Sequence, residues 1–268
     1  MGKKKRRDIP DYGLEIFETH CHLDYLKSHE IDELLQKCRD LTINKIVTIS
    51  VEPSNLAKVI QLATDHEMIY TCQGIHPHEA KDYTDEVEAT IKSNLSHAKV
   101  LAVGEIGLDF YYNHSPHDTQ RDVFRRQMNI AIENDYPVII HSRDAEEDTI
   151  EILDELSPSL KRKGVIHSFT SKPELAENAL KNGFYLGFNG IITFKNAQDV
   201  RDAVELAPLE RILIETDAPF LTPEPYRGRE NAPVYLPFIA EKIAEIKNVS
   251  VEEVIKTTTQ NAIDLFQF

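Results

Sequence analysis

The chain alternates short apolar runs with longer segments in which apolar residues recur every three or four positions. Apolar runs rich in Val and Ile are typical of buried parallel strands, whereas the longer spacing is typical of amphipathic helices. About eight strands are expected, a number that closes a barrel. They fall at residues 15–19, 45–50, 68–73, 100–105, 137–141, 164–167, 185–188 and 211–215.

The segments between these runs predict helices at residues 30–40, 54–66, 118–134, 144–156 and 173–182. Several begin near Ser, Asp or Pro and end near Gly or Asn, as helix caps do, and Gly183 is the clearest stop. A doubly wound open sheet shows the same alternation, but its usual Gly-rich phosphate loop does not follow the first apolar run here. The pattern therefore predicts an α/β protein with a single TIM-type (β/α)8 barrel.

The length of 268 residues, with 41% hydrophobic content, suits one such barrel. We expect one barrel domain at residues 14–268, preceded by a basic, flexible tail at residues 1–13. The basic run Lys3-Lys4-Lys5-Arg6-Arg7 is interpreted first as a solvated tail, and help in attracting an acidic substrate is the alternative.

The three cysteines are widely spaced and form no CxxC pair, which favours a reducing compartment over a thiolate zinc site. No apolar stretch reaches the roughly 18 residues of a membrane span, and the basic start leads into Asp8-Ile9-Pro10-Asp11. We therefore expect a cytoplasmic protein without membrane contact. The oligomeric state stays open, with a monomer as the simplest expectation.

Most of the expected strands are followed by polar residues that can bind a metal or donate a hydrogen bond: His20 and His22, Ser50, His76, Glu105, His141, His167 and Asp217. In a barrel these ends meet on the face where active sites lie. Each residue alone is more simply a core histidine or a helix-capping acid. That interpretation does not suit six of them together, namely His20, His22, Glu105, His141, His167 and Asp217.

The triplet His20-Cys21-His22 places two imidazoles at alternate positions of a strand, so both point into the barrel mouth while Cys21 packs on the other side. Glu105 follows an apolar run, and a buried acid at that place needs a cation. Four imidazoles and two carboxylates suit two divalent cations such as Zn, Mn or Mg, if one carboxylate bridges them.

Five motifs place these residues in a wider pattern: Thr19-His20-Cys21-His22-Leu23-Asp24, Gly74-Ile75-His76-Pro77-His78, Gly104-Glu105-Ile106-Gly107-Leu108-Asp109, His141-Ser142-Arg143-Asp144-Ala145 and Glu215-Thr216-Asp217-Ala218-Pro219. Three lesser blocks accompany them: Gly190-Ile191-Ile192-Thr193-Phe194-Lys195-Asn196, Pro225-Tyr226-Arg227-Gly228 and Thr259-Gln260-Asn261-Ala262. On these motifs the chain resembles the TatD family of metal-dependent deoxyribonucleases, in the wider amidohydrolase superfamily, essentially from Ile16 to Phe266.

The resemblance implies the barrel fold and 3′-to-5′ degradation of DNA. It also implies a division of the ligands: His20, His22 and Asp217 hold one cation, His141 and His167 hold the other, and Glu105 bridges them. Many amidohydrolases have a carboxylated lysine at the bridging place. The chain departs from the family pattern twice, with Glu18 where Asp is common and with His167-Ser168-Phe169-Thr170 where a His-Cys-Phe-Ser-like run is frequent.

The formal charge of −15 argues against ordinary nucleic-acid binding. Two divalent cations with two carboxylate ligands would leave a site of about +2, which attracts a phosphodiester despite the acidic surface. In the predicted reaction the catalytic residues are Asp217 as general base, Glu105 as bridge and His76, which contacts the phosphate or the leaving oxygen. A purely structural turn at Pro77 is the alternative for His76.

Further substrate contacts are predicted from Arg143, Lys195 and Arg227, with a solvated surface as the alternative for each. The predicted substrate is single-stranded DNA, and RNA stays open. Two other functions are compatible with the sequence. One is hydrolysis of an ester, amide or aminoacyl bond at the same cations, and the other is a binding or scaffold module in which metals only stabilise the barrel.

Overall fold

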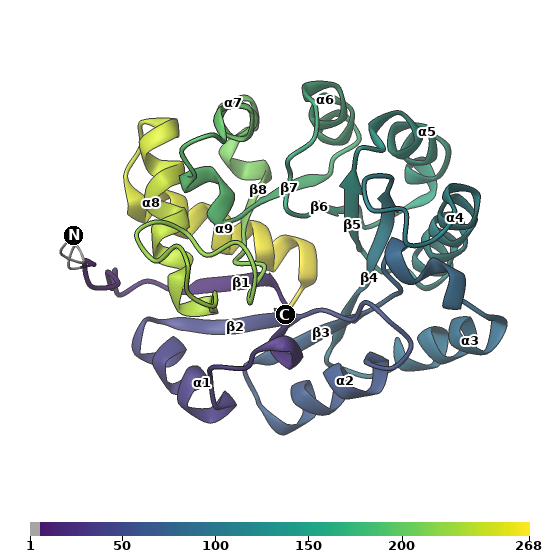
Figure 1. Cartoon of the computed structure of the whole chain (residues 1–268), viewed down its shortest axis with the longest axis horizontal. Coiled ribbons are helices and arrows are strands. Elements are labelled where there is room, and N and C mark those ends of the chain that lie inside the picture. The colour runs from purple at the N-terminus through teal and green to yellow at the C-terminus, as the bar shows by residue number, and fades with distance from the viewer. Residues whose placement is uncertain (1–5) are drawn as a thin grey trace.

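The computed structural model of the protein describes residues 6–268, which form a nearly closed barrel of parallel strands surrounded by helices (Figure 1). The strands follow one another around the sheet in chain order. They are β1 (Ile16–Cys21), β2 (Ile43–Thr48), β3 (Ile69–Gln73), β4 (Val100–Asp109), β5 (Val138–Arg143), β6 (Gly164–Ile166), β7 (Tyr185–Phe188) and β8 (Ile212–Ile214). The prediction of a single (β/α)8 barrel is confirmed.

Parallel ladders join each strand to the next from β1 to β8. The seam between β8 and β1 is joined by individual hydrogen bonds instead. The hydroxyl of Thr19 donates to the carbonyl of Ile214 over 2.9 Å, and the amide of Asp217 donates to the carbonyl of His20 over 2.9 Å. This seam therefore brings the first and last parts of the chain together beside His20.

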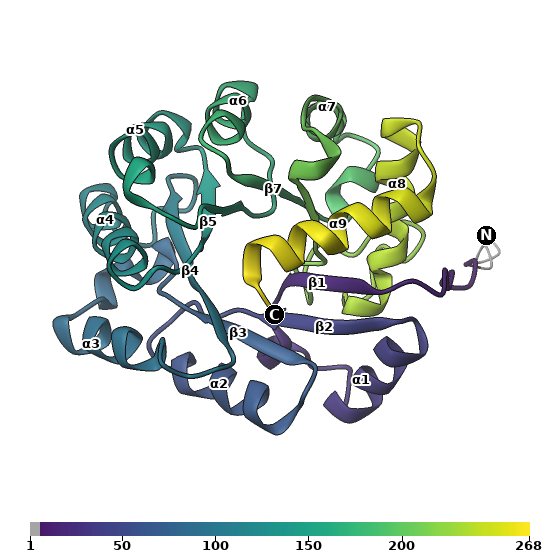
Figure 2. The same ribbon diagram turned by 180° about the vertical axis from the view of Figure 1, so that it is seen from behind.

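Helices surround the strands, most of them in an outer ring (Figure 1). They are α1 (Ile31–Asp40), α2 (Leu56–Asp65), α3 (Asp85–Asn94), α4 (His117–Asn134), α5 (Glu146–Leu156), α6 (Pro173–Lys181), α7 (Gln198–Leu206), α8 (Leu236–Lys247) and α9 (Val251–Phe266). Short 3-10 turns lie at η1 (Leu23–Tyr25), η2 (Pro77–Asp82), η3 (Ser157–Ser159), η4 (Gly190–Thr193), η5 (Leu209–Arg211) and η6 (Pro233–Tyr235). Seen from behind, α9 lies across the barrel beside β1 (Figure 2).

Local signals explain where several helices begin and end. The side chain of Thr84 accepts a hydrogen bond from the amide of Val87 at the start of α3, and Ser250 caps α9 by accepting from the amide of Glu253. Helix α6 begins at Pro173, and the predicted stop at Gly183 is confirmed by its φ of +83°, which glycine adopts without steric cost.

Most strand boundaries differ from the prediction by a few residues, and two of the differences bear on the candidate site. Strand β4 does not end at Glu105 but continues to Asp109, because Gly107 and Asp109 pair with His141 and Arg143 of β5. Strand β1 ends at Cys21, so His22 lies just beyond the strand and not within it. Both differences arise from pairing between strands, which the pattern along one strand does not contain.

The barrel interior is filled by a cluster to which every strand contributes. Its strand members are Phe17, Val47, Cys72, Leu101, Ile139, Val165, Tyr185 and Leu213, and α9 adds Leu265 and Phe266. A larger cluster packs the outer helices against the sheet. The interior is therefore a packed apolar core.

The first described residues contact the loop after β8 and helix α8. The guanidinium of Arg6 donates to the carbonyl of Pro225 over 3.0 Å, and the hydroxyl of Tyr12 donates to the carboxylate of Glu241 over 2.7 Å. Lys3 to Lys5 of the basic run lie outside the described residues. The flexibility predicted for residues 1–13 and the domain boundary at residue 14 stay predictions.

Between residues 6 and 268, none of the helices combines the length and the apolar character that crossing a bilayer requires.

Candidate metal centre

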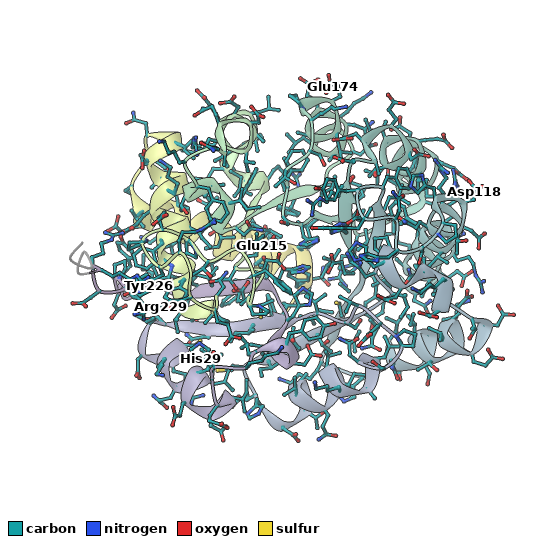
Figure 3. All side chains as sticks on the ribbon, viewed as in Figure 1. His29, Asp118, Glu174, Glu215, Tyr226 and Arg229 are labelled. Atoms are coloured by element: carbon teal, nitrogen blue, oxygen red, sulfur yellow. The ribbon has the colours of Figure 1, made fainter. Side chains whose placement is uncertain are left out.

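The predicted ligands gather at the carboxyl ends of the strands, above the apolar interior. His141 follows Ile139 by two positions and His167 follows Val165 by two, so both imidazoles continue the inward-facing side of their strands. Figure 3 places Glu215, two positions after the interior residue Leu213, inside the barrel, whereas Asp118 and Glu174 lie on the outer helices. The fold thus delivers residues from distant parts of the chain to one place.

The first half-site consists of His20, His22 and Asp217. The Oδ1 atom of Asp217 lies 3.3 Å from Nε2 of His22 and 3.8 Å from Nε2 of His20. Asp217 has a φ of +56°, and this left-handed backbone turns its carboxylate toward the two imidazoles. The three ligand atoms lie within 4.8 Å of one another, close enough to hold one cation.

The second half-site consists of Glu105, His141 and His167. The Oε1 atom of Glu105 lies 2.7 Å from Nε2 of His167 and 3.1 Å from Nδ1 of His141. The two imidazole nitrogens are 3.2 Å apart. All three atoms therefore converge on one point, as ligands of a cation do.

Glu105 and the ring of His20 join the two half-sites. The second carboxylate oxygen of Glu105, Oε2, lies 3.4 Å from Nε2 of His20. The rings of His20 and His167 are stacked, with centroids 3.8 Å apart and planes 3° apart. One carboxylate therefore faces both groups of imidazoles, one oxygen to each.

The donor atoms fit divalent cations. Within residues 6–268, Nε2 of His20 is buried and has no hydrogen-bond partner, although four carboxylate and imidazole side chains lie around this residue. A buried nitrogen without a partner costs stability unless another group satisfies it. Imidazole and carboxylate are the ligands of Zn and Mn sites, so His20, His22, Glu105, His141, His167 and Asp217 could hold such ions.

Comparison with known proteins agrees with this centre. A family model described as TatD related DNase matches residues 17–267. The chain belongs to the TatD family. It is 40% identical over 253 residues to the uncharacterized metal-dependent hydrolase YabD of Bacillus subtilis, covering 94% of this chain and 99% of the relative.

Two further relatives of this TatD protein define its class. The 3′-5′ ssDNA/RNA exonuclease TatD of Erwinia amylovora is 34% identical over 241 residues, covering 88% of this chain and 93% of the relative. The crystal structure of the TatD homolog YJJV from Escherichia coli superposes with a TM-score of 0.89 at 30% identity, covering 94% of this chain and 98% of that one. The protein is a metal-dependent hydrolase of the TatD type.

Mutual electrostatics in this TatD centre favour charged ligands. Burial opposes the ionised form of Glu105, but the surrounding imidazoles of His167, His76 and His20 hold the pKa of its carboxyl well below the usual range. In return, although burial acts against it, the Glu105 carboxylate raises the pKa of His167 well above that of a free imidazole. Without a cation, the Glu105 carboxylate thus favours a proton on His167.

The same balance acts in the first half-site. Burial opposes both charged forms, yet the hydrogen bond and charge of Asp217 raise the pKa of His22. The imidazoles of His22 and His20 lower the pKa of Asp217. By contrast, burial lowers the pKa of His20, so this imidazole stays neutral and presents a free electron pair.

His76 lies beside the second half-site. Its Nε2 atom is 3.4 Å from Oε1 of Glu105, and its Nδ1 atom accepts a hydrogen bond from the amide of His78 over 3.1 Å. Burial lowers the pKa of His76 well below the usual value. A neutral ring that accepts at Nδ1 carries its proton at Nε2, directed toward the centre. The catalytic and substrate roles of His76 stay predictions.

Asp109 is a supporting residue to which sequence reasoning assigned no role. Its Oδ2 atom lies 2.8 Å from Nε2 of His78 and 3.3 Å from Nε2 of His141. Although burial opposes it, hydrogen bonds from these two histidines lower the pKa of Asp109. The available signal was spacing, because Asp109 follows Glu105 by four positions and so faces the same side of β4.

Glu215 plays a similar part behind His167. Its Oε1 atom lies 3.6 Å from Nδ1 of His167 and accepts a hydrogen bond from the amide of Ser168 over 2.6 Å. Gly187 leaves the space for this carboxylate, because a Cβ atom at that position would lie 2.5 Å from Oε2 of Glu215. In the sequence, Glu215 stands two positions before Asp217. This spacing was the available signal that the side chain of Glu215 points toward the barrel interior.

Glu18, one of the two departures from the family pattern, contacts the backbone of the first half-site. Its carboxylate accepts hydrogen bonds from the amide of His20 over 3.1 Å and from the amide of Thr216 over 2.9 Å. Burial raises the pKa of Glu18 to about 8. The residue therefore joins β1 to the segment after β8 through contacts at both ligand-bearing stretches.

Ser50 and Cys21, which lie near the ligands in the sequence, have structural roles. The hydroxyl of Ser50 bonds the carbonyls of Gly74 and Gly104 over 3.1 and 3.2 Å, so Ser50 fixes the strand ends and does not face the centre as a donor. Cys21 is buried in the core, and its burial raises the pKa of the thiol well above the usual value. The prediction that Cys21 is a packing residue is confirmed.

Besides His76, three substrate-binding residues were predicted, and the structure shows contacts of two of them with aromatic rings. The guanidinium of Arg143 lies over the rings of Tyr111 and Tyr112, at 4.2 and 4.8 Å from their centroids. The guanidinium of Arg227 lies 3.6 Å from the ring centroid of Phe194, and Lys195 is exposed beside it. Their substrate contacts stay predictions.

Proposed function

We propose that this TatD-family hydrolase cleaves phosphodiester bonds of DNA, as a 3′-to-5′ exonuclease on single strands, with two divalent cations bridged by Glu105. The observation that carries the proposal is the pair of half-sites that share one carboxylate. Oε1 of Glu105 faces His167 at 2.7 Å, and Oε2 faces His20 at 3.4 Å. A carboxylate with one oxygen toward each group suits a bridging ligand.

Cations in the two half-sites would activate a water molecule and neutralise charge at the phosphoryl group. Asp217 is the general base of the proposal. Its pKa is lowered, although burial opposes this, by His22 and His20, so the carboxylate is ionised and can accept a proton from a water molecule beside it. His76 is neutral, with Nε2 directed to the centre, and is placed to donate a hydrogen bond to the phosphate or to the leaving oxygen.

The acidic surface does not exclude this substrate. The formal charge of the chain is −15, but two cations with the carboxylates of Glu105 and Asp217 leave about +2 at the centre. The protein therefore has a local attraction for one phosphodiester rather than a basic surface for a duplex. A single strand whose end enters the barrel mouth meets this requirement best.

The comparisons support a nucleic-acid substrate without deciding it for this chain. The Erwinia amylovora relative is named a 3′-5′ ssDNA/RNA exonuclease, whereas the more similar Bacillus subtilis relative is named only a metal-dependent hydrolase. The substrate is therefore the part of the proposal that needs an experiment.

The test compares two substrates under one set of conditions. A single-stranded oligodeoxynucleotide labelled at its 3′ end is incubated with the protein and Mg, Mn or Zn, in parallel with an aminoacyl ester. Early release of the labelled mononucleotide, abolished by chelator and restored by metal, is expected. If the ester is hydrolysed and the DNA stays intact, the nuclease proposal is wrong. The protein would then be an ester or amide hydrolase that uses the same centre.

A second outcome concerns the scaffold alternative. If neither substrate is cleaved and the cations only raise the melting temperature of the protein, the metals stabilise the barrel without catalysis. Glu105→Ala serves as the matched inactive control in each assay, because it removes the shared carboxylate and leaves Asp217 and His76 in place.

A further inference from the structure

Two exposed tyrosines stand beside the metal centre. Tyr111 and Tyr112 lie in the turn after β4, separated from the strand by Phe110, and 55% and 50% of their surfaces are exposed. Large aromatic side chains are normally buried, and paired exposed rings mark surfaces that bind a partner. Their backbone is held in place, because Oδ1 of Asp109 accepts hydrogen bonds from the amides of both residues over 3.0 Å.

A cation covers both rings. The guanidinium of Arg143 lies 4.2 Å from the centroid of Tyr111 and 4.8 Å from that of Tyr112. Within residues 6–268 this guanidinium forms no ion pair, although the protein is strongly acidic. Arg143 differs in this respect from three arginines of α4 that are all paired with carboxylates, namely Arg121, Arg125 and Arg126. The donors of Arg143 are therefore available to a ligand.

The aromatic pair is connected to the metal centre by one carboxylate. Asp109 holds the amides of Tyr111 and Tyr112 through Oδ1, and its other oxygen lies 3.3 Å from Nε2 of His141. The ring of Tyr112 is also 5.5 Å from that of His78. A group that rests on the tyrosines thus lies next to the second half-site.

We propose that Tyr111, Tyr112 and Arg143 form a stacking platform for a nucleobase of a single-stranded substrate. The inference rests on the proposed nuclease function and adds to it the means of holding the strand. Every base has a π-face, so stacking on aromatic rings is tolerant of sequence, and a guanidinium adds a cation over the rings or a fork for a backbone phosphate. Duplex DNA cannot use the platform, because its bases are stacked inside the helix.

The experiment separates the base from the backbone. Initial rates are measured with a single-stranded oligodeoxynucleotide and with the same strand carrying abasic residues near its 3′ end. For the wild-type protein, KM is expected to be about tenfold lower with the base-bearing strand, since stacking is worth that order of affinity per base. In Tyr111→Ala/Tyr112→Ala the ratio of the two KM values falls toward one.

Two controls accompany the variant. Tyr111→Phe/Tyr112→Phe keeps both rings and is expected to retain the KM ratio of the wild type. Leu206→Ala removes another exposed apolar side chain, at the end of α7, and is also expected to retain it. Circular dichroism verifies that each variant is folded. The double alanine variant is expected to fold, because both tyrosine rings are exposed and lie outside the packed core.

Binding without turnover distinguishes the platform from the nuclease proposal. Fluorescence anisotropy with both labelled strands is recorded in chelator, where hydrolysis is absent. Cleavage of both strands with equal KM and equal binding by wild type and double alanine variant overturns the platform and leaves the nuclease proposal intact. Absence of both cleavage and binding overturns both. Preferential binding of the base-bearing strand without cleavage supports the platform and overturns the nuclease proposal.

Discussion

The Oδ2 atom of Asp109 lies 3.3 Å from Nε2 of His141, on the side of the ring opposite to Glu105. The other ring nitrogen, Nδ1, lies 3.1 Å from Oε1 of Glu105. An imidazole that donates its outer N–H to a carboxylate presents its inner nitrogen to a cation, with its orientation and tautomer fixed. Asp109 therefore controls how His141 enters the second half-site.

Substitution of Asp109 tests this control. Asp109→Asn is expected to lower the cation affinity of the second half-site by roughly 10- to 100-fold, because outer carboxylates contribute that much to metal binding. Titration of the cation-free protein with Mn or Zn, followed by calorimetry, measures the loss. Asp118→Asn is the matched control, since that carboxylate is exposed on α4 far from the centre (Figure 3). Equal affinities in the two variants would contradict the assigned role.

Removal of the shared carboxylate is expected to have a larger effect. Glu105→Ala should lower the number of bound cations and reduce turnover to near zero, because both half-sites lose an oxygen. Metal analysis of the purified variant and its rate with labelled single strands measure both losses. Glu174→Ala, on the outer surface of α6, should match the wild type (Figure 3). Full metal content with unchanged hydrolysis in Glu105→Ala would exclude the bridging role.

Glu18 makes the stability of the cation-free protein depend on pH. Its pKa is raised by burial to about 8 in the folded protein, from 4.5 in an unfolded chain, so the folded state holds this proton more tightly. The contribution of Glu18 to the free energy of unfolding is therefore complete at pH values below its pKa in the unfolded chain. It is lost as the pH rises toward its pKa in the folded protein, by about 1.4 kcal/mol per pH unit between the two pKa values.

The variant Glu18→Gln lacks this proton. The free energy of unfolding of each protein is measured with urea in chelator. The value for Glu18→Gln minus that for the wild type should increase by about 1.4 kcal/mol per pH unit between pH 5 and 8. Parallel curves for the two proteins over this range would show that the carboxyl does not hold the proton.

Cation binding is expected to release protons. Burial opposes the charged form of His167 and His22, but the carboxylates of Glu105 and Asp217 raise the pKa of these imidazoles. In the cation-free protein they therefore keep their protons to higher pH than free imidazoles do. A cation needs the neutral form of each imidazole, so binding expels protons, and affinity falls as the pH is lowered. Calorimetry in buffers of different ionisation enthalpy counts the released protons. Binding without proton release would contradict the charge state described for the centre.

The barrel and its ligands could largely be predicted from the chain. The strands were visible because a barrel buries each strand on both faces, which leaves apolar runs such as Val100 to Val103. The six ligands were visible because each follows such a run, and the TatD motifs then divided them between two cations. Their meeting around Glu105 agrees with that division, while the number of cations stays a prediction.

Other features depend on contacts between distant segments. The roles of Asp109 and Glu215 required the true length of β4 and the space left by Gly187, which come from neighbouring strands. Helices α3 and α7 to α9 were not among the predicted helices, although α9 closes one end of the barrel through Phe266. The exposed rings of Tyr111 and Tyr112 follow an apolar strand and carry no signal of exposure in the sequence. The proposal of a stacking platform therefore rests on their positions in the fold.

The most direct test of the account is the number and place of the bound cations. Crystals grown with Mn are measured at a wavelength where Mn scatters anomalously. Two peaks are expected, one among His20, His22 and Asp217 and one between His141 and His167, with a carboxylate oxygen of Glu105 toward each. A single peak, or full occupancy elsewhere with the six side chains bare, would contradict the shared two-cation centre.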